Sequence, residues 1–334
     1  MRNLITDVAG LSVGCAHDER LASGVTVTVF DDPAIASVSV LGGAPAGRDL
    51  GCLEPDATVE FVDAIVLCGG SAYGLDAASG AQAWLRARGR GHPVRTLRVP
   101  IVPQAIIFDL LNGGDKDWGR FPPYRELAYA ACEAAGLGVP LGTVGGGFGA
   151  TTANLKGGQG SASARTSAGY VVAALVLVNA IGSAVIGDGP HFWAAPWEQG
   201  KEFGGLGSPQ RLTDVERSLL WKGAGEVATT IAIVATDAVL TKAQAKRLAI
   251  IAQGGLSKGL RLAHAMFDGD TVFAAATGRK RLEEPRRDLV EIGALASDCL
   301  ARAVARGVYE ATALPFPGAL PSWTDKFRSA HGGG

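Results

Sequence analysis

The stretch TTIAIVATDA, which starts at Thr229, has the apolar pattern of a buried β-strand. Its apolar residues alternate between two faces, and its β-branched side chains favour extended backbone. A polar segment that contains several glycines precedes the strand, which then opens with two threonines. The pattern alone does not say whether Thr229 or Thr230 has a chemical role or only forms the strand.

The same analysis predicts an α/β chain in which strands and helices follow one another. Residues 170–187 are apolar over nearly a membrane-spanning length, but they include Asn179, Gly182 and Ser183 and are rich in valine, which predicts two buried strands joined by a turn. Thr241 and Gln244 form a capping box that opens a helix. The remaining predictions are strands at 23–30, 35–41, 64–68 and 270–278, and helices at 71–88 (capped by Ser71), 124–136, 242–253 and 286–307.

Composition narrows the class of protein further. The chain has 334 residues, of which 47% are hydrophobic, so a large core can form. The net charge of −1 gives no reason to expect nucleic acid or an anionic membrane as a partner. The five cysteines are scattered without a C-x-x-C spacing, and no signal peptide opens the sequence. A cytoplasmic protein without disulfides or a structural zinc site is therefore predicted.

Several short motifs invite a chemical interpretation. GGSAYG resembles a nucleophile elbow, but Tyr73 stands where the last glycine of G-x-S-x-G belongs. GGGFGA at residues 145–150 fits a loose dinucleotide-binding pattern, yet no Asp or Glu occurs from 134 to 187 to bind a ribose. The same absence leaves Lys156 without an acidic neighbour in the sequence, so it faces either solvent or a pocket.

Asp268 and Asp270 lie two positions apart before a predicted strand, so their side chains are expected on the same side. An Asp-x-Asp pair can form a turn, act in catalysis or hold calcium. Asn179 is polar within an apolar strand, where an unpaired amide costs about 1–3 kcal/mol. Asn179 is therefore either structural or an aimed hydrogen-bond donor.

Five segments together resemble the P1 (DmpA-like) family of self-processing peptidases. GGSAYGLDAASG, VPIVPQAIIFDL, LVLVNAIG, TTIAIVATDA and DGDTVFAAATG occur in the family's order, and the resemblance extends over residues 10–307. The family includes β-aminopeptidases, L-aminopeptidase/D-esterases and 6-aminohexanoate-oligomer (nylon oligomer) endohydrolases. The segments TTIAIV and AIIFDL are most similar to the nylon-oligomer branch.

The resemblance implies that the chain cuts itself between Ala228 and Thr229, which makes Thr229 an N-terminal nucleophile. A threonine hydroxyl needs a base beside it, and a free α-amine, with a pKa of about 7.7–8.0, supplies one on the same residue. By resemblance, Asp268 and Asp270 orient the nucleophile and the amine. Asn179 donates to the oxyanion, and loss of such a donor costs about 100- to 1000-fold in rate.

The chain departs from the nylon-oligomer enzymes at three positions. Ala228 replaces the asparagine before the nucleophile, and Phe108 replaces the active-site tyrosine. Asn154 aligns with the active-site lysine, and Lys156, two positions on, is expected to face the same side and to take over its role. Phe108, Asn154 and Tyr73 are expected to contact the substrate.

The implied architecture is one domain, residues 1–334, folded as a four-layer αββα sandwich of the DmpA/ornithine acetyltransferase type. Self-cleavage would give an α chain, 1–228, and a β chain, 229–334. The expected enzyme is a homotetramer of αβ heterodimers that hydrolyses small amides or peptides with a free amine and needs no metal or cofactor. The alternatives are acyl transfer of the ornithine-acetyltransferase kind and a non-catalytic protein that binds small molecules.

Overall fold

Most of the strands of the protein belong to one large mixed sheet. The computed structural model describes residues 1–223 and 227–327. The polar segment predicted before Thr229 therefore includes three residues, 224–226, that lie outside the described part. The strands are Leu11–Asp18 (β1), Ser23–Val40 (β2), Gly47–Arg48 (β3), Phe61–Cys68 (β4), His92–Val94 (β5), Leu97–Val99 (β6), Gln104–Ile106 (β7), Gly158–Arg165 (β8), Val171–Asn179 (β9), Thr229–Ala238 (β10) and Thr271–Lys280 (β11).

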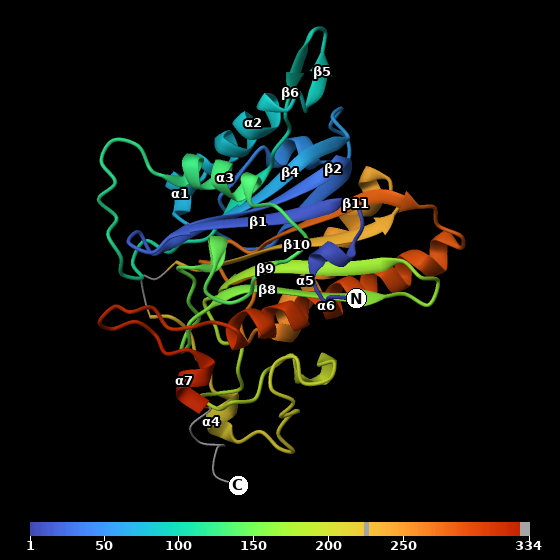
Figure 1. Ribbon diagram of the computed structural model, residues 1–334. Helices are drawn as coiled ribbons and strands as arrows, with labels where there is room; N and C mark the ends of the chain where they lie inside the picture. Colours follow the sequence, from blue (N-terminus) through green and yellow to red (C-terminus); the bar gives the residue numbers. More distant parts are fainter. Residues whose placement is uncertain (224–226, 328–334) are drawn as a thin grey trace.

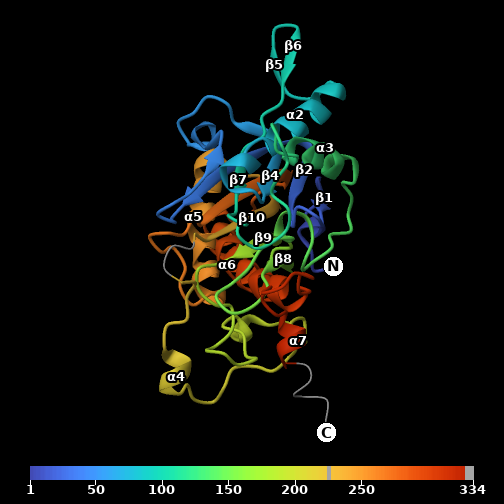
Figure 2. The same ribbon diagram turned by 90° about the vertical axis from the view of Figure 1, so that its left-hand side faces the viewer.

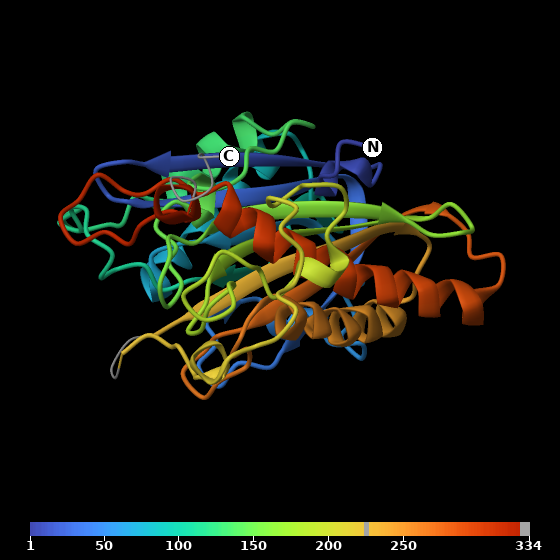
Figure 3. The same cartoon turned by 90° about the horizontal axis from the view of Figure 1, so that it is seen from below.

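Helices cover the sheet on both outer sides. Figure 1 shows α2 and α3 above β1, β2 and β4, and α5 and α6 below β8 to β11. In Figure 2 the same succession of layers is seen from the side, and Figure 3 shows α5 and α6 side by side on the lower face. The helices are Ser71–Gly74 (α1), Ala77–Ala87 (α2), Tyr124–Glu133 (α3), Asp214–Arg217 (α4), Lys242–Gly259 (α5), Pro285–Tyr309 (α6) and Trp323–Phe327 (α7).

Strand β2 joins the two halves of the sandwich. The strands of the main sheet are ordered β3-β7-β4-β2-β11-β10-β9-β8, with β1 also paired to β2. The first part of β2 pairs with β1 and β4, whereas residues 35–40 pair with β11. The register against β4 shifts between Val29 and Ala34, an interval in which Asp31, Asp32 and Pro33 are exposed. The two halves therefore fold face to face while remaining one hydrogen-bonded sheet.

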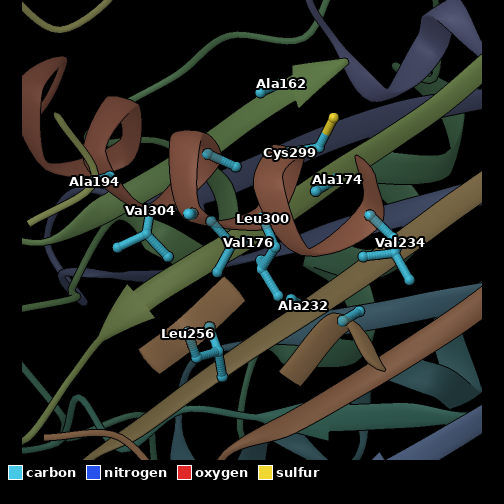
Figure 4. Close-up of a cluster of buried hydrophobic side chains, with 14 of the residues drawn as sticks. Ala162, Ala174, Val176, Ala194, Ala232, Val234, Leu256, Cys299, Leu300 and Val304 are labelled. Atoms are coloured by element: carbon cyan, nitrogen blue, oxygen red, sulfur yellow. The ribbon is translucent and has the colours of Figure 1, made fainter. Parts of the chain in front are cut away.

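Three hydrophobic clusters fill the three interfaces between the four layers. One packs α2 and α3 on β1, β2 and β4, and a second lies between the two halves of the sheet. The third packs α5 and α6 on β8 to β11, where Figure 4 shows Leu256 and Leu300 beside Val176 and Ala232. These clusters confirm the predicted αββα sandwich.

Several predicted boundaries are wrong for identifiable reasons. The two strands predicted at 23–30 and 35–41 are the single strand β2. The second strand predicted within 170–187 does not form, because residues after Asn179 bond to loops, as Ala153 N does to Gly182 O. Ser71 does not cap a long helix: its φ is +52° and its N–H donates to the Ile107 carbonyl. The capping box of Thr241 is confirmed.

The cysteines and the long apolar run also have a clear outcome in the structure. The five cysteines are all free thiols. No helix in the described ranges is both long and apolar enough to cross a membrane, so residues 170–187 do not form the transmembrane helix that their length allowed.

The close approach of α6 to β8 gives a test of this packing. A Cβ added at Gly160 would lie 1.8 Å from the Ala303 carbonyl oxygen, whereas one added at Gly138 meets no atom within 4 Å. We expect Gly160→Ala to lower the free energy of unfolding by about 1–3 kcal/mol or more, as overpacking does. Gly138→Ala should leave it nearly unchanged. Denaturant unfolding of both variants measures this, and equal stabilities would contradict the described contact.

Candidate active site

Strand pairing brings the predicted site residues to one end of the sheet. Thr229 opens β10 and lies opposite Asn179, the last residue of antiparallel β9. On the other side β10 runs parallel to β11, and Ala228 forms a bridge with Asp268 just before both strands begin. All four residues are at most 2% exposed. The structure thus brings four of the residues that sequence analysis selected together in a buried position.

The two threonines at the start of β10 face opposite sides. Along β10, Ile231 and Ile233 belong to the cluster between the sheet halves, whereas Ala232 and Val234 belong to the cluster under α5 and α6. By the same alternation Thr229 faces the space between the sheet halves. Thr230 faces the helices, which confirms that the two threonines are not equivalent.

The peptide bond before Thr229 is held from several directions. The Ala228 carbonyl accepts hydrogen bonds from the Gly269 N–H, at 3.1 Å, and from the Thr229 hydroxyl. The Ala228 N–H donates to the Phe267 carbonyl at 3.4 Å. A Cβ at position 269 would lie 2.7 Å from Thr229 Oγ1, so only glycine lets this backbone approach the hydroxyl so closely. The Thr229 hydroxyl therefore lies directly against the carbonyl of the preceding residue.

The two acidic residues have different environments. Asp270 accepts hydrogen bonds from the Thr230 N–H at 2.9 Å and the His264 N–H at 2.7 Å, so it fixes the start of β10. Asp268 Oδ1 is buried and has no hydrogen-bond partner among the described residues. Burial, followed by the negative charge of Asp270, raises the pKa of Asp268 above its usual range. Asp268 is therefore suited to exchanging a proton, and Asp270 to positioning.

Asn179 is oriented by three partners. Its Oδ1 accepts from the Thr151 N–H at 3.0 Å and from Lys222 Nζ at 3.3 Å, and its Nδ2 donates to the Phe108 carbonyl at 2.9 Å. These partners agree on which end of the amide is the donor. A primary amide carries two N–H groups, so Asn179 Nδ2 has a second hydrogen beyond the one that Phe108 accepts.

A pocket of about 370 Å³ opens beside these residues. Its walls include Phe108, Thr151, Trp221, Lys222, Val227 and Leu320. Phe108 and Lys222 both contact Asn179, and Val227 adjoins Ala228, so the pocket lies next to the start of β10. Its size suits a small ligand with apolar and polar parts. Phe108 lines this pocket, and its contact with a substrate stays a prediction.

Three other predicted site residues are not among the described walls of this pocket. Lys156 is 1% exposed, and its ammonium group donates to the carbonyls of Gly147, Ala150 and Gly157, which fastens the glycine-rich loop. The prediction that it faces the same side as Asn154 and contacts the site is therefore not supported by these contacts. Burial lowers the pKa of Lys156 to about 7; the negative charge of Asp109 opposes this effect, and the positive charge of Lys222 adds to it.

Asn154 and Tyr73 are also absent from the described walls of the pocket. Asn154 donates to Asp188 at 3.0 Å and accepts from the Ser183 hydroxyl at 2.9 Å, so it ties two loops together. Tyr73 is 56% exposed and packs edge-on against Trp118. Neither contact was visible in the sequence, because each partner lies at least 29 positions away.

Lys222 is the functional candidate that sequence analysis missed. It lies in the polar segment before the strand, where a lysine normally faces solvent, yet it is only 7% exposed and reaches Asn179. Lys222 lies six residues before Ala228 in a segment without helix or strand periodicity, so the sequence did not indicate that its side chain is buried. In the described ranges, no group of three or more His, Cys, Asp or Glu side chains has the arrangement of a metal site.

The buried carboxylate of Asp268 makes a prediction about stability. In a Thr229→Ala background, we expect Asp268→Asn to raise the free energy of unfolding at neutral pH. In the native state the pKa of Asp268 is about 8, whereas in the unfolded chain it has its ordinary value of about 3.9. Between these two values only the native state keeps the proton, so the free energy of unfolding falls as the pH rises from about 3.9 to about 8. The advantage of the variant should vanish below about pH 4, where both states are protonated.

Urea unfolding at several pH values measures the difference. Asp56→Asn, at an exposed position, is the matched control and should show no pH-dependent gain. An Asp268→Asn variant that is less stable than its parent at neutral pH would contradict the assigned environment.

Comparison with known proteins identifies the family. The sequence pattern of Peptidase family S58 matches residues 3–318. An uncharacterized aminopeptidase of Mycobacterium tuberculosis is 40% identical, over 99% of both chains. The 6-aminohexanoate-oligomer endohydrolase of Paenarthrobacter ureafaciens is 27% identical, over 81% of this chain and 74% of its own. The similarity to the nylon-oligomer branch is therefore present, but it is lower than that to the mycobacterial protein.

Solved structures share the fold. A β-aminopeptidase of a Burkholderia species superposes with a TM-score of 0.72 at 21% identity, covering 99% of this chain and 95% of its own. An L-aminopeptidase D-Ala-esterase/amidase of Ochrobactrum anthropi, a variant of the Ntn hydrolase fold, gives 0.72 at 20% identity, covering 98% and 93%. These similarities confirm the predicted fold, and the motifs predicted the family correctly. The chain belongs to Peptidase family S58 and is a hydrolase of peptide or amide bonds.

Proposed function

We propose that the chain cuts itself between Ala228 and Thr229 and that the freed Thr229 is the nucleophile of an aminopeptidase. The observation that carries this proposal is the contact between the Thr229 hydroxyl and the Ala228 carbonyl, which also accepts the Gly269 N–H. The products would be an α chain, 1–228, and a β chain, 229–334. A homotetramer of these αβ heterodimers in the cytoplasm remains a prediction from the family resemblance.

The first step is attack within the chain. Thr229 Oγ bonds to the Ala228 carbonyl carbon, and the negative charge that develops on the carbonyl oxygen is stabilised by the Gly269 N–H. The C–N bond breaks as the Thr229 nitrogen takes up a proton, which leaves an ester. Water then hydrolyses the ester to a carboxylate at Ala228 and a free hydroxyl at Thr229. Asp268, with its raised pKa and unpaired oxygen, is the group suited to move these protons.

The second reaction is turnover of an external substrate. The new α-amine of Thr229, with an ordinary pKa of about 7.7–8.0, takes the proton from its own hydroxyl. The hydroxyl attacks the substrate carbonyl, and the second N–H of Asn179 Nδ2 is available to the oxyanion. Loss of the leaving amine gives an acyl-enzyme, which water hydrolyses. Asp270 holds the start of the strand through the Thr230 N–H while this happens.

The two adjacent threonines provide the sharpest test of self-cleavage. We expect Thr229→Ala to remain a single chain and Thr230→Ala to be cut, because only Thr229 has its hydroxyl on the Ala228 carbonyl. Intact mass and N-terminal sequencing of the smaller product, which should begin TTIAIV, measure this. An uncut wild-type chain after prolonged incubation, or a cut in Thr229→Ala, would refute the proposal.

The pocket walls give a prediction about substrates. Apolar side chains such as Leu111, Trp221 and Leu320 should favour acyl groups with methylene chains, at roughly 0.8 kcal/mol per buried CH₂. In a series of ω-aminoacyl p-nitroanilides, two further buried methylenes should therefore raise kcat/KM by about tenfold. The N-acetylated compounds are the matched controls and should not be hydrolysed. A flat response along the series, or equal turnover of the acetylated compounds, would contradict this assignment.

A further inference from the structure

The hairpin formed by β5 and β6 is exposed along its whole length. Figures 1 and 2 show it standing out from the body of the molecule, beyond α2. Its two strands form a small sheet of their own, and every residue from 92 to 99 is exposed. An isolated two-stranded hairpin is only marginally stable in water and usually needs another element packed against it. Within the described part of the chain, no element buries either face of this hairpin.

One face of the hairpin is apolar. Val94 lies opposite Leu97 in the strand pairing, and Val99 is two positions beyond Leu97, so these three side chains share a face. Their exposed fractions are 48%, 66% and 45% for Val94, Leu97 and Val99. Arg98, between Leu97 and Val99, points to the opposite face. A group of apolar side chains that stays open to solvent on a folded protein is typical of a surface that binds a partner.

The charges on and around the hairpin are of one sign. Five arginines lie between residues 86 and 98, and no Asp or Glu occurs from 77 to 108. Because the whole chain has a net charge of −1, the rest of the chain is net negative. Arg95 occupies the turn at the tip with a φ of +53°, a conformation that glycine adopts readily and arginine does not. An arginine in a strained turn points to a contact made by its side chain.

An acidic and apolar surface adjoins the base of the hairpin. The Asp63 N–H donates to the Ile101 carbonyl, and the Ile101 N–H donates to the Asp63 carboxylate, both at 2.9 Å. These bonds bring the start of β4 level with the end of β6. There Glu60 is exposed, and Phe61 is 47% exposed. Neither Arg95 at the tip nor Glu60 at the base forms an ion pair with another described residue.

A second copy of the chain has the charges and the apolar surface that match this hairpin. In a two-fold contact the same surface serves both copies, so each contact between two different residues occurs twice. When two hairpins lie antiparallel, the tip of each meets the base of the other, and the two apolar faces cover one another. An anionic membrane or a nucleic acid fits less well, because the exposed Asp56 and Glu60 near the base would repel phosphate groups.

We propose that two copies of the chain associate through the β5–β6 hairpin about a two-fold axis. The three apolar side chains of each copy pack on those of the other, and Arg95 at each tip pairs with Glu60 of the partner copy. The inference goes beyond the proposed function, since it depends neither on self-cleavage nor on turnover. It names a surface and its contacts, whereas the family resemblance predicts only how many chains assemble.

Sedimentation velocity of the full chain tests the apolar contact. Leu97→Glu places a charge within the apolar face and leaves the core intact, because this side chain is 66% exposed in a single copy. We expect the mass of the assembly to fall to half of the wild-type value or less. Val215→Glu, at an apolar position in α4 that is 79% exposed, is the matched control and should keep the wild-type mass. A monomeric wild-type chain, or equal dissociation of both variants, overturns the proposal.

Reversal of the two charges tests the ion pair. Arg95→Glu and Glu60→Arg each bring like charges together, so each should raise the dissociation constant by about tenfold or more. The double variant restores the pair with its signs exchanged and should return the dissociation constant to about the wild-type value. Arg95→Gly removes the charge and relieves the turn, so it should weaken association without lowering Tm. Weakening that simply adds up in the double variant contradicts the proposed contact.

Cosedimentation with vesicles that contain anionic phospholipid checks the other occupant. We expect the wild-type and Leu97→Glu chains alike to stay in the supernatant. Binding of the wild-type chain, but not of Leu97→Glu, would assign the apolar face to a membrane and overturn the proposal. All these measurements can be repeated on the uncut Thr229→Ala chain. A failure of self-cleavage would therefore count against the proposed function and leave the test of the interface unaffected.

Discussion

The position of β10 between antiparallel β9 and parallel β11 determines the geometry of the whole site. Strand β9 is antiparallel to β10, so it ends where β10 begins, and β11 is parallel to β10, so it begins at the same end of the sheet. The end of β9 and the start of β11 therefore both lie beside Thr229. This arrangement brings three residues to the same end of the sheet: Asn179 at the end of β9, Thr229 at the start of β10, and Asp268 just before β11. The hydrophobic clusters on both faces of β10 hold this register, because a slip by one residue would exchange its two faces.

Burial at this end of the sheet makes every polar group expensive unless it is paired. Asp270 and Asn179 satisfy this requirement with backbone N–H and carbonyl groups, which rigid neighbouring strands and loops supply. Asp268 does so only in part, since its Oδ1 has no partner within the described ranges. An incompletely compensated carboxylate destabilises the fold, and such groups are typical of sites where a proton moves. The contrast between Asp268 and Asp270 is therefore one of environment, since the two residue types are the same.

The sequence predicts those parts of the structure that depend on local periodicity. Strand β10, its two faces and the capping box of Thr241 follow from neighbouring residues, and all three are found. The continuity of β2 could not be predicted from neighbouring residues, because Asp31, Asp32 and Pro33 have the composition of a turn. In the structure they lie in an exposed part of the strand, where proline is tolerated because its missing donor is not needed.

Long-range contacts decide which polar residues reach the site, and these leave no local pattern. Lys156 and Lys222 are both buried lysines, yet the first binds carbonyls of its own loop and the second binds Asn179, 43 positions away. The resemblance to the family places its active-site lysine at Asn154 or Lys156, on the expectation that these residues belong to a regular strand. In the structure the chain around these two residues is irregular. Side-chain direction follows from spacing only within regular structure, so the spacing of residues 154 and 156 does not say which side they face.

The contacts around Ala228 link the two reactions of the proposed mechanism. The same Thr229 oxygen would attack first the Ala228 carbonyl and later that of a substrate, so both carbonyls must approach it from a similar position. After the cut, the Gly269 N–H and the Phe267 carbonyl, which now bind the Ala228 carbonyl and N–H, would lose these partners if the new C-terminus moved away. A substrate with a carbonyl and a nearby amine N–H would restore both hydrogen bonds. Buried backbone groups left unpaired cost free energy, so the vacated site itself favours a ligand shaped like the residue that left it.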